Sequence, residues 1–253
     1  MTEPATTETR PPGTRGLSAH QLTAAQRVGI MLLSYLPLLH VATVLAIALW
    51  PWAAWPYRLL ASAAALYLAP PLLARLVLAL APIRGQRHAV GSRAYATWWL
   101  LLMLQTVFCR FPALDEVLRL VPALYSMWLR LWGSRIGRLT YWAPGTLVLD
   151  RSFLDLGDDV IFGASVTLSP HLVARNAQGD LEFMIAPIRV GHRALVGGFS
   201  AFAAGSEIAD DDAPRAFTLS PPFSRWRDGK RVREPRAPAS PPATPIAEGP
   251  GTA

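Results

Sequence analysis

The chain has 253 residues, of which 52% are hydrophobic, and a formal net charge of +7. A basic chain can bind nucleic acid, but here the basic residues cluster beside apolar segments and in the C-terminal tail, so we expect anionic lipid headgroups and no nucleic acid as partner. The single cysteine, Cys109, excludes an intramolecular disulfide and is compatible with a reducing compartment.

The N-terminal third contains two long apolar runs. Residues 1–27 form a polar leader that we expect to be disordered, and two transmembrane helices with their connections fill residues 28–94. No charged residue interrupts 28–50, and only Arg75 interrupts 59–82. At ~1.5 Å per residue each run covers a ~30 Å hydrocarbon layer. The first run is longer than the ~7–15 apolar residues of a signal peptide, so we interpret it as a retained anchor.

The residues that flank these runs predict their orientation. The connection between them is rich in aromatic residues that favour the headgroup zone, namely Trp50, Trp52, Trp55 and Tyr57. The arginines lie mainly outside the pair, at positions Arg10, Arg15, Arg27, Arg84, Arg87 and Arg93, with Arg58 alone in the connection. The positive-inside rule therefore places both ends in the cytoplasm, and with them the rest of the chain.

Residues 95–132 mix apolar residues with charges at helical spacings. The first part, 95–111, is apolar but short for a full crossing, and the second part carries Asp115, Glu116, Arg119 and Arg130. We expect helices that lie in the membrane interface. A third crossing by residues 95–111 is the alternative, and it would invert the topology.

A period of six residues dominates the region that follows. Counted by sixes from Ile136, twelve of thirteen positions to 208 are large and apolar: Ile136, Trp142, Val148, Leu154, Val160, Val166, Leu172, Met184, Val190, Val196, Phe202 and Ile208. Small or polar residues often stand two places earlier, and in an extended strand residues two apart point to the same side. Each rung would therefore send two side chains into a common interior.

Short strands joined by corners every six residues predict a three-sided coil of stacked parallel strands, at about eighteen residues per turn. We place this parallel β-helix at residues 133–212, with residues 173–183 as a loop that leaves the coil where the repeat lapses. Residues 213–253 form a C-terminal extension that we expect to be largely disordered.

The repeats Ile136-Gly137, Val190-Gly191 and Val196-Gly197, with the preceding Ser134 and Thr140 and the later Ser200 and Ser206, resemble those of the hexapeptide-repeat acyltransferases. The resemblance covers roughly residues 130–225, and it looks closest to membrane-associated members related to the terminal region of some non-ribosomal peptide synthetases and to polysaccharide O-acetyltransferases. It implies a left-handed, single-stranded β-helix, an acyl-coenzyme A co-substrate, no metal, and a homotrimer with sites between subunits.

The resemblance also implies roles for particular residues. His171 would be the general base that takes a proton from an acceptor hydroxyl or amine, and imidazole is mostly neutral near pH 7. Backbone groups of Gly197 and Gly198 could receive the thioester or its pantetheine arm. Asn176 and Asp180 could orient His171 or touch the acceptor. The implied function is transfer of an acyl group, such as acetyl, to a glycan, a lipid-linked or a peptide-derived acceptor.

The same residues also have interpretations without catalysis. His171 could be a loop residue without chemistry, and we interpret His192 as a solvated corner residue. We interpret Asp155, Asp158 and Asp159 as solvent-facing residues or as hydrogen-bonding residues at corners rather than as a metal site. Cys109 is a poor nucleophile candidate in its apolar segment.

Two other function classes fit a membrane-anchored coil. One is a non-catalytic scaffold for a biosynthetic synthetase. The other is a zinc-dependent protein of the carbonic anhydrase type, which needs three histidines on one zinc, whereas only His171 and His192 fall within the predicted coil.

Overall fold

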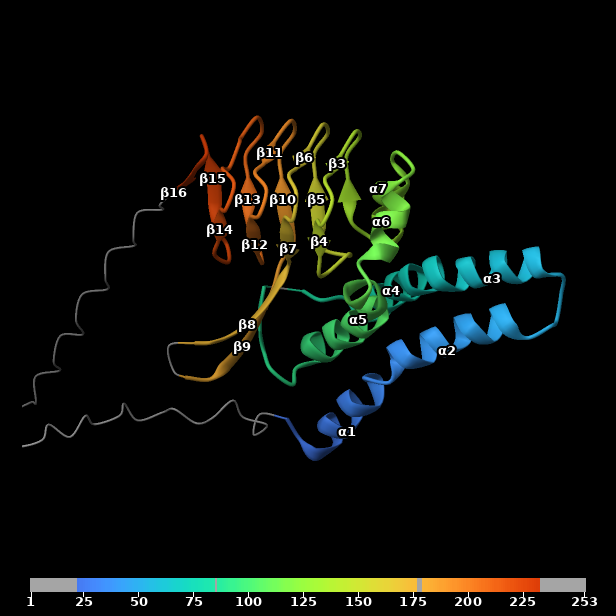
Figure 1. Cartoon of the computed structure of the whole chain (residues 1–253). Helices are drawn as coiled ribbons and strands as arrows, with labels where there is room; N and C mark the ends of the chain where they lie inside the picture. Colours follow the sequence, from blue (N-terminus) through green and yellow to red (C-terminus); the bar gives the residue numbers. More distant parts are fainter. Residues whose placement is uncertain (1–21, 85, 177–178, 233–253) are drawn as a thin grey trace, which may run out of the picture.

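The computed structural model describes residues 22–84, 86–176 and 179–232. Two helical stretches, Ala24–Leu49 and Trp55–Leu80, are each 26 residues long and apolar enough to cross a membrane. They confirm the two predicted apolar helices, while the crossing itself stays a prediction. Figure 1 shows both stretches beneath the strand-rich half of the molecule.

Each stretch is broken once. The first comprises α1 (Ala24–Leu33) and α2 (Leu36–Leu49), and the second comprises α3 (Trp55–Tyr67) and α4 (Ala69–Leu80), with proline at the start of α2 and of α4. Proline lacks the N–H that would continue a helix, which accounts for both breaks. Helix α1 starts inside the leader that we expected to be disordered to residue 27, because Thr23 and Gln26 form a capping box at its first turn.

Residues 93–131 form α5 (Arg93–Arg110), α6 (Ala113–Arg119) and α7 (Leu124–Leu131). We expected surface helices in this region, but α5 is a core helix that buries Trp98, Leu101 and Phe108 among others. Its apolar side chains occupy several faces, and a helix that is hydrophobic all round packs inside the protein. Helices α5 and α6 meet at a bend of 79°, so together they qualify as a bent span by length and composition. A crossing by α5 therefore stays an untested alternative.

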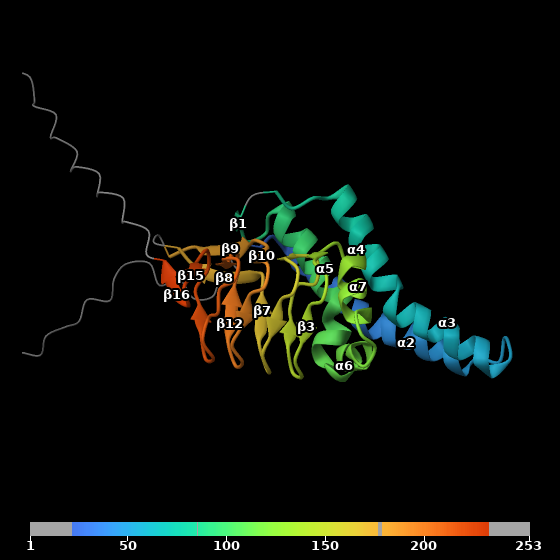
Figure 2. The same cartoon turned by 90° about the horizontal axis from the view of Figure 1, so that it is seen from above.

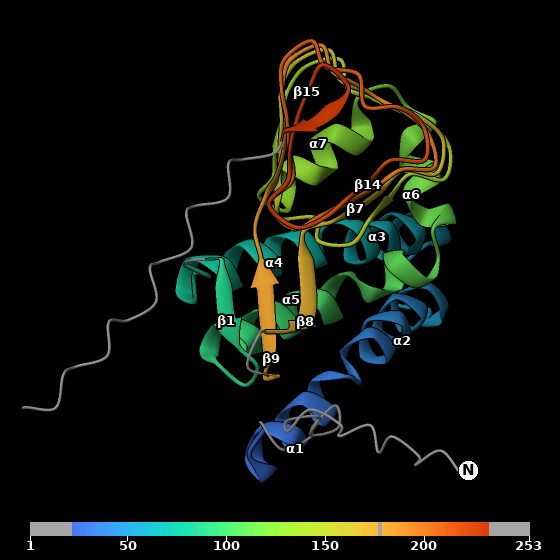
Figure 3. The ribbon, with the colours of Figure 1, turned by 90° about the vertical axis from the view of Figure 1, so that its left-hand side faces the viewer.

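The strands after α7 build a three-sided coil of parallel ladders, seen end-on as a triangle in Figure 3. The first face consists of β2 (Arg135–Ile136), β5 (Leu154–Leu156), β10 (Ile188–Val190), β13 (Glu207–Ile208) and β15 (Arg225–Arg227). The second face consists of β3 (Tyr141–Trp142), β6 (Ile161–Phe162) and β11 (Leu195–Val196). The third face consists of β4 (Leu147–Val148), β7 (Thr167–Ser169), β12 (Ala201–Ala203) and β14 (Leu219–Ser220). The left-handed winding implied by the resemblance stays a prediction.

The ladder register corrects the simple count by sixes. Ile136 pairs with Leu156, twenty residues later, Leu156 with Val190, thirty-four later, and Val190 with Ile208, eighteen later. The first turn therefore has two extra residues, which lie between Val148 and β5. Each strand has two inward positions, two residues apart. Because of the two extra residues, the count by sixes follows one of these positions as far as Val148 and then falls on the other, which holds Leu154, Val160 and Val166. Both columns face inward and are buried, so the apolar interior was correct although the register was not.

The residue after an inward side chain is small because successive turns stack there. A Cβ atom on Gly157 would lie 2.7 Å from the backbone nitrogen of His192, and one on Gly191 would lie 2.4 Å from that of Asp210. Real Cβ atoms do not approach backbone so closely, so only glycine fits at these corners.

The segment expected as a loop is a β-hairpin. Strands β8 (His171–Arg175) and β9 (Leu181–Ile185) pair antiparallel, and β1 (Arg87–Ala89) adds to the free side of β9. Leu172 and Met184, which the count by sixes assigned to the coil interior, therefore lie on this hairpin. It leaves the coil toward α5, as Figures 1 and 3 show.

The coil also continues beyond the boundary predicted at residue 212. Strand β14 pairs with β12, β15 pairs with β13, and β16 (Lys230–Val232) folds back on β15. The expectation of disorder is therefore wrong for residues 213–232, because each ladder offers a free strand edge on which the next strand can pair. Residues 233–253 lie outside the described part.

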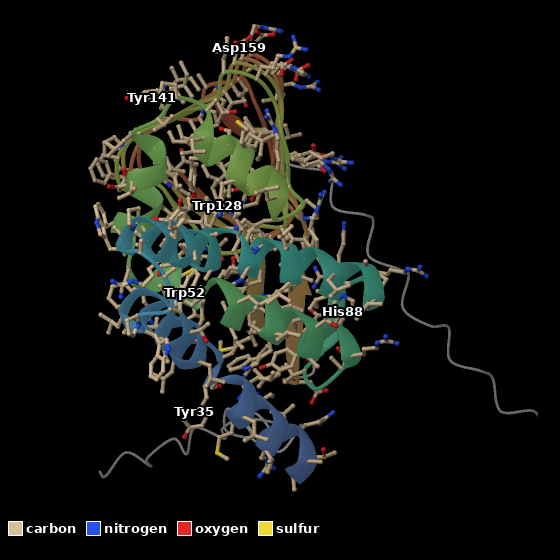
Figure 4. The ribbon with its side chains drawn as sticks, turned by 90° about the vertical axis from the view of Figure 1, so that its right-hand side faces the viewer. Tyr35, Trp52, His88, Trp128, Tyr141 and Asp159 are labelled. Carbon is tan, nitrogen blue, oxygen red and sulfur yellow. The ribbon has the colours of Figure 1, made fainter. Side chains whose placement is uncertain are left out.

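Coil and helices share one apolar core, and α7 closes the first turn of the coil. Trp142 stacks on Phe162 inside the coil at a ring distance of 4.8 Å, and its Nε1 donates to Ser126 of α7 at 3.0 Å. Trp128 of α7 lies between coil and helices in Figure 4, and its Nε1 donates to the carbonyl of Tyr67 at 2.7 Å. The view from above in Figure 2 shows α5, α6 and α7 next to the first turns.

The interior of the coil predicts a large stability effect. Phe162→Ala removes a fully buried ring, and we expect unfolding to become easier by about 3–5 kcal/mol because of lost burial and a cavity. Leu219→Ala is the matched control, since that side chain is 76% exposed and its loss should cost no more than about 1 kcal/mol. Chemical denaturation of the full chain in detergent, followed by tryptophan fluorescence, measures both. Equal losses would mean that the interior is not where the ladders place it.

Candidate active site

Two insertions interrupt the coil at one edge, between the third and first faces. The first, residues 149–153, joins β4 to β5, and the second, residues 170–187, contains the β8–β9 hairpin and joins β7 to β10. Because β4 pairs with β7 and β5 pairs with β10, the two insertions stack on each other in successive turns. We call this place the insertion edge.

The insertion edge brings Asp150 and His171 together. An oxygen of Asp150, Oδ2, lies 2.5 Å from Nδ1 of His171, a short hydrogen-bond distance. The Asp150 side chain is almost fully buried, whereas 20% of the His171 side chain is exposed. The solvent therefore reaches the histidine ring but not the carboxylate behind it.

This contact fixes the chemistry of the ring. An ionised carboxylate can only accept hydrogen bonds, so Nδ1–H of His171 donates to Asp150. The lone pair on Nε2 is then the one that can accept a proton. The same logic operates where a carboxylate holds a catalytic histidine in its active tautomer and balances the imidazolium that forms. The pair is therefore suited to general-base catalysis at Nε2.

Helix α5 covers the pair from the other side. Trp98 donates from Nε1 to Oδ1 of Asp150 at 3.0 Å, and its ring lies 4.7 Å from the ring of His171. Trp98 also contacts Phe183 of the hairpin at a ring distance of 4.6 Å. Gln105 adds a longer contact, 3.5 Å from its Nε2 to the same Asp150 oxygen. Both residues lie on the face of α5 that points toward the insertion edge.

The residue after Asp150 carries a buried charge. Arg151 is fully buried and pairs through Nη2 with Asp115 of α6 at 2.7 Å. Burial opposes its charge, but the attraction of Asp115, and then of Tyr125 and Cys109, raises the guanidinium pKa above its usual value. Burial, followed by the repulsion of Asp115, also raises the pKa of Tyr125, which donates to Asp115 at 3.2 Å. Arg151 is therefore a permanent cation inside the protein.

The other predicted site residues lie elsewhere. Gly197 and Gly198 stand at the edge between the second and third faces, in the corner that joins β11 to β12. Strand β12 pairs with β7, which ends at Ser169, near His171. A Cβ on Gly197 would lie 2.2 Å from the nitrogen of Ala216, so stacking of turns already requires a glycine there. The structure does not bring these glycines to His171, and their role in binding stays a prediction.

Asn176 and Asp180 lie at the tip of the β8–β9 hairpin. The Asp180 backbone N–H donates to Oδ1 of Asn176 at 2.9 Å, and the Asn176 N–H donates to the carbonyl of Asp180. Five residues of strand at ~3.3 Å each separate this tip from His171. Asp150 and Trp98, rather than Asn176 and Asp180, therefore orient the histidine.

Of the remaining candidates, His192 stands at a corner, whereas Asp155 lies on strand β5 and not at a corner. His192 accepts from the backbone N–H of Asp158 at 3.0 Å at the edge between the first and second faces, which fits the solvated corner role. Asp155 bonds Arg135 at 2.6 Å. Within the described ranges no group of three or more His, Cys, Asp or Glu residues is placed to hold a metal ion. His171 and His192 stand at different edges of the coil.

Sequence reasoning missed Asp150, Trp98 and Gln105. The signal for Asp150 was present: an Asp-Arg pair stands between the apolar pairs Leu147-Val148 and Phe153-Leu154, where the period of six slips by two. Trp98 and Gln105 belong to a helix far away in sequence, and nothing in its pattern marks the side that faces the coil.

No protein-family model matches this chain, and no curated protein matches it either. Among solved structures, a maltose O-acetyltransferase from Clostridium difficile 630 is similar at 14% identity and a TM-score of 0.41, covering 65% of this chain and 97% of its own. A hexapeptide-repeat acetyltransferase from Vibrio cholerae gives 15% identity, a TM-score of 0.30, and 48% and 88% coverage. A galactoside acetyltransferase in complex with coenzyme A gives 16%, 0.31, and 48% and 79%. Likeness at this level leaves the function to be argued from the site.

The buried ion pair predicts a non-additive stability effect. Asp115→Ala leaves Arg151 charged, buried and unpaired, so we expect a loss of about 3–5 kcal/mol in unfolding free energy. Adding Arg151→Met removes the stranded charge and should recover most of this loss. Denaturation of both variants and of Arg151→Met alone completes the cycle, and strictly additive losses would contradict a buried pair.

Proposed function

We propose that this chain is a membrane-anchored acyltransferase that moves an acyl group, such as acetyl, from a coenzyme A thioester to a hydroxyl or amine acceptor. The observation that carries the proposal is the Asp150–His171 pair at the insertion edge, with a buried carboxylate behind a solvent-reachable imidazole. The hexapeptide resemblance supplies the reaction class, and the pair supplies a base suited to it.

In the proposed reaction, Nε2 of His171 takes the proton of the acceptor O–H or N–H as that atom attacks the thioester carbonyl. The new C–O or C–N bond forms, the C–S bond breaks, and the proton passes from His171 to the departing thiolate of coenzyme A. Asp150 balances the imidazolium in between. No covalent acyl-enzyme is required, and the thiol of Cys109 instead accepts a hydrogen bond from Nη1 of the buried Arg151 at 3.3 Å.

The anchor belongs to the same proposal. Large apolar side chains are exposed all along the two helical stretches, and the aromatic residues of their connection, Trp50, Trp52, Trp55 and Tyr57, are 53–72% exposed. Figure 4 labels Tyr35 of the first stretch and Trp52 of the connection. Such a surface is costly in water and is satisfied by lipid. We place it in the cytoplasmic membrane with the coil in the cytoplasm, where acyl-coenzyme A is available.

A homotrimer is a further part of the proposal. Tyr141, Ile161 and Leu195 occupy matching outward positions on β3, β6 and β11 and are 43–59% exposed. The neighbouring edge adds Phe199 and Phe217, whose exposed rings stack at 5.3 Å. Exposed apolar side chains gathered on one face and its edge typically contact protein. The resemblance implies that the partner is a second copy of the chain.

The acceptor class stays open among glycans, lipid-linked molecules and peptide-derived molecules. Mass spectrometry of these three fractions, from cells with the wild-type gene and with His171→Ala, seeks one acyl mass that disappears. In parallel, purified full-length protein is tested for thiol release from acetyl-coenzyme A with each fraction as acceptor.

We expect His171→Ala to lower the rate by about 10²–10⁴, the usual contribution of a positioned base. Asp150→Asn should also lower it strongly, because an amide cannot balance the imidazolium. His192→Ala, at a different edge, is the matched control and should keep the wild-type rate. If His171→Ala leaves acylation intact while deletion of the gene abolishes it, the chain is a scaffold and not the transferase.

The proposed orientation makes a separate prediction. In a Cys109→Ser background, Ala53→Cys in the aromatic connection should react with a membrane-impermeant maleimide. The cells are treated so that the reagent reaches the outer face of the cytoplasmic membrane while that membrane stays sealed. Asp159→Cys, at a coil corner that Figure 4 labels, should react only after the membrane is permeabilised. A third crossing by residues 95–111 would place both cysteines on the same side of the membrane, so equal reactivity of the two, before or only after permeabilisation, would indicate that topology.

A further inference from the structure

We infer that the helical layer is part of the catalytic centre: Gln105, Arg151 and Asp115 form a buried relay that positions Asp150, and through it His171. The inference rests on the proposed function, because it assigns positioning residues to its general base. It gives α5 and α6 a role that neither the coil repeats nor the anchor requires.

The first step of the relay is the orientation of Gln105, whose side chain is buried. Its Oε1 accepts from the backbone N–H of Arg151 at 3.0 Å and from Nη1 of the same residue at 3.4 Å. Two donors on one side force the amide oxygen toward Arg151, so the NH₂ group faces Oδ1 of Asp150. If the amide were flipped, its NH₂ group would face the N–H donors of Arg151 and its oxygen would face the carboxylate of Asp150. Gln105 therefore has one orientation, and it reinforces the bond from Trp98.

The second step is the fixation of Arg151. Asp115 of α6 holds its Nη2, and the guanidinium lies 5.5 Å from the ring centres of both Phe108 and Trp128. Tyr125 of α7 in turn bonds Asp115. Three helices therefore contact one arginine whose neighbour in sequence is Asp150. The peptide that joins Asp150 and Arg151 has little freedom to move.

The third step concerns charge. The ionisable groups around the pair are Arg151, Asp115, Tyr125 and Cys109 on the helix side, whereas the hairpin face toward α5 presents apolar Phe183 and Ile185. Arg87 and Glu182 pair with each other on the opposite face of the hairpin. Asp115 cancels the charge of Arg151, so an imidazolium at His171 meets only the carboxylate of Asp150.

The fourth step is the energetic argument. A buried ion pair is commonly no more stabilising than apolar side chains of the same volume, so stability alone does not require one here. Arg151 is adjacent in sequence to Asp150, and both residues contact Gln105. The location of the pair at the one corner that holds the candidate carboxylate points to a positioning role.

Two sets of variants test the relay in the full chain. The first is Gln105→Leu, which removes the amide. The second is Asp115→Asn with Arg151→Met, which removes both charges together and so avoids a stranded one. The matched control is Asp155→Asn with Arg135→Met, which removes an equivalent Arg–Asp pair, 2.6 Å apart, from the exposed first face.

Two readouts separate positioning from mere folding. Nitrogen-15 NMR of histidine-labelled protein, with His171 assigned by a His171→Asn variant, reports which ring nitrogen carries the proton without any substrate. We expect wild type and control to show Nδ1–H, and both relay variants to show a mixture of tautomers. In steady-state kinetics we expect kcat to fall roughly 10- to 100-fold, the range for residues one hydrogen bond removed from a functional histidine. KM for acyl-coenzyme A should stay within about twofold of wild type.

The outcomes are distinct. If both relay variants keep the wild-type tautomer and kcat, the relay does not exist. If Gln105→Leu does not fold, the charge-free double variant decides alone. If wild type transfers no acyl group, the proposed function fails, yet the tautomer comparison still confirms or overturns the relay.

Discussion

The site depends on the stacking of successive coil turns at one edge. The ladder positions of the three faces are constrained by strands above and below, so extra residues can enter only at corners. Here two consecutive turns carry extra residues at the same corner, two in the segment 149–153 and a whole hairpin after β7. Since stacked strands lie about 4.8 Å apart, residues added at these corners must touch. Asp150 and His171 face each other for this reason.

The helices supply contacts at the candidate site that the coil strands do not. At the insertion edge the backbone leaves the regular ladders, and the buried carboxylate of Asp150 needs donors that no coil strand supplies. Trp98 provides an indole N–H and a ring for His171 at the same time. The apolar cluster that includes Phe108, Trp128 and the coil interior makes helices and coil one body. The segment that we expected to rest on the membrane surface therefore lines the candidate active site.

Sequence patterns predicted the scaffold well and the site poorly, for one physical reason. The period of six arises because each short strand repeats the same two inward positions, so Ile136, Trp142 and Val148 already specify a three-sided coil. Periodicity carries no information about where the period breaks. The slip at residues 149–153 therefore passed unnoticed between two inward columns, and Asp150 with it. His171 was found through the family resemblance, whereas its partners on α5 depend on packing between segments remote in sequence.

The two sets of Arg–carboxylate pairs show how context separates structural from functional charge. On the exposed first face, matching positions of successive strands hold Arg135, Asp155, Arg189, Glu207 and Arg225, an alternating ladder in contact with water. Such pairs contribute little individually, and their main effect is to favour the correct register. Arg151 and Asp115 are instead removed from water, where each charge is tolerable only beside the other. Burying an ion pair costs desolvation free energy, and the ladders on the surface already supply charge pairing, so the stability of the fold does not require a pair in the core. We therefore attribute this pair to its neighbour, the Asp150 carboxylate that holds His171.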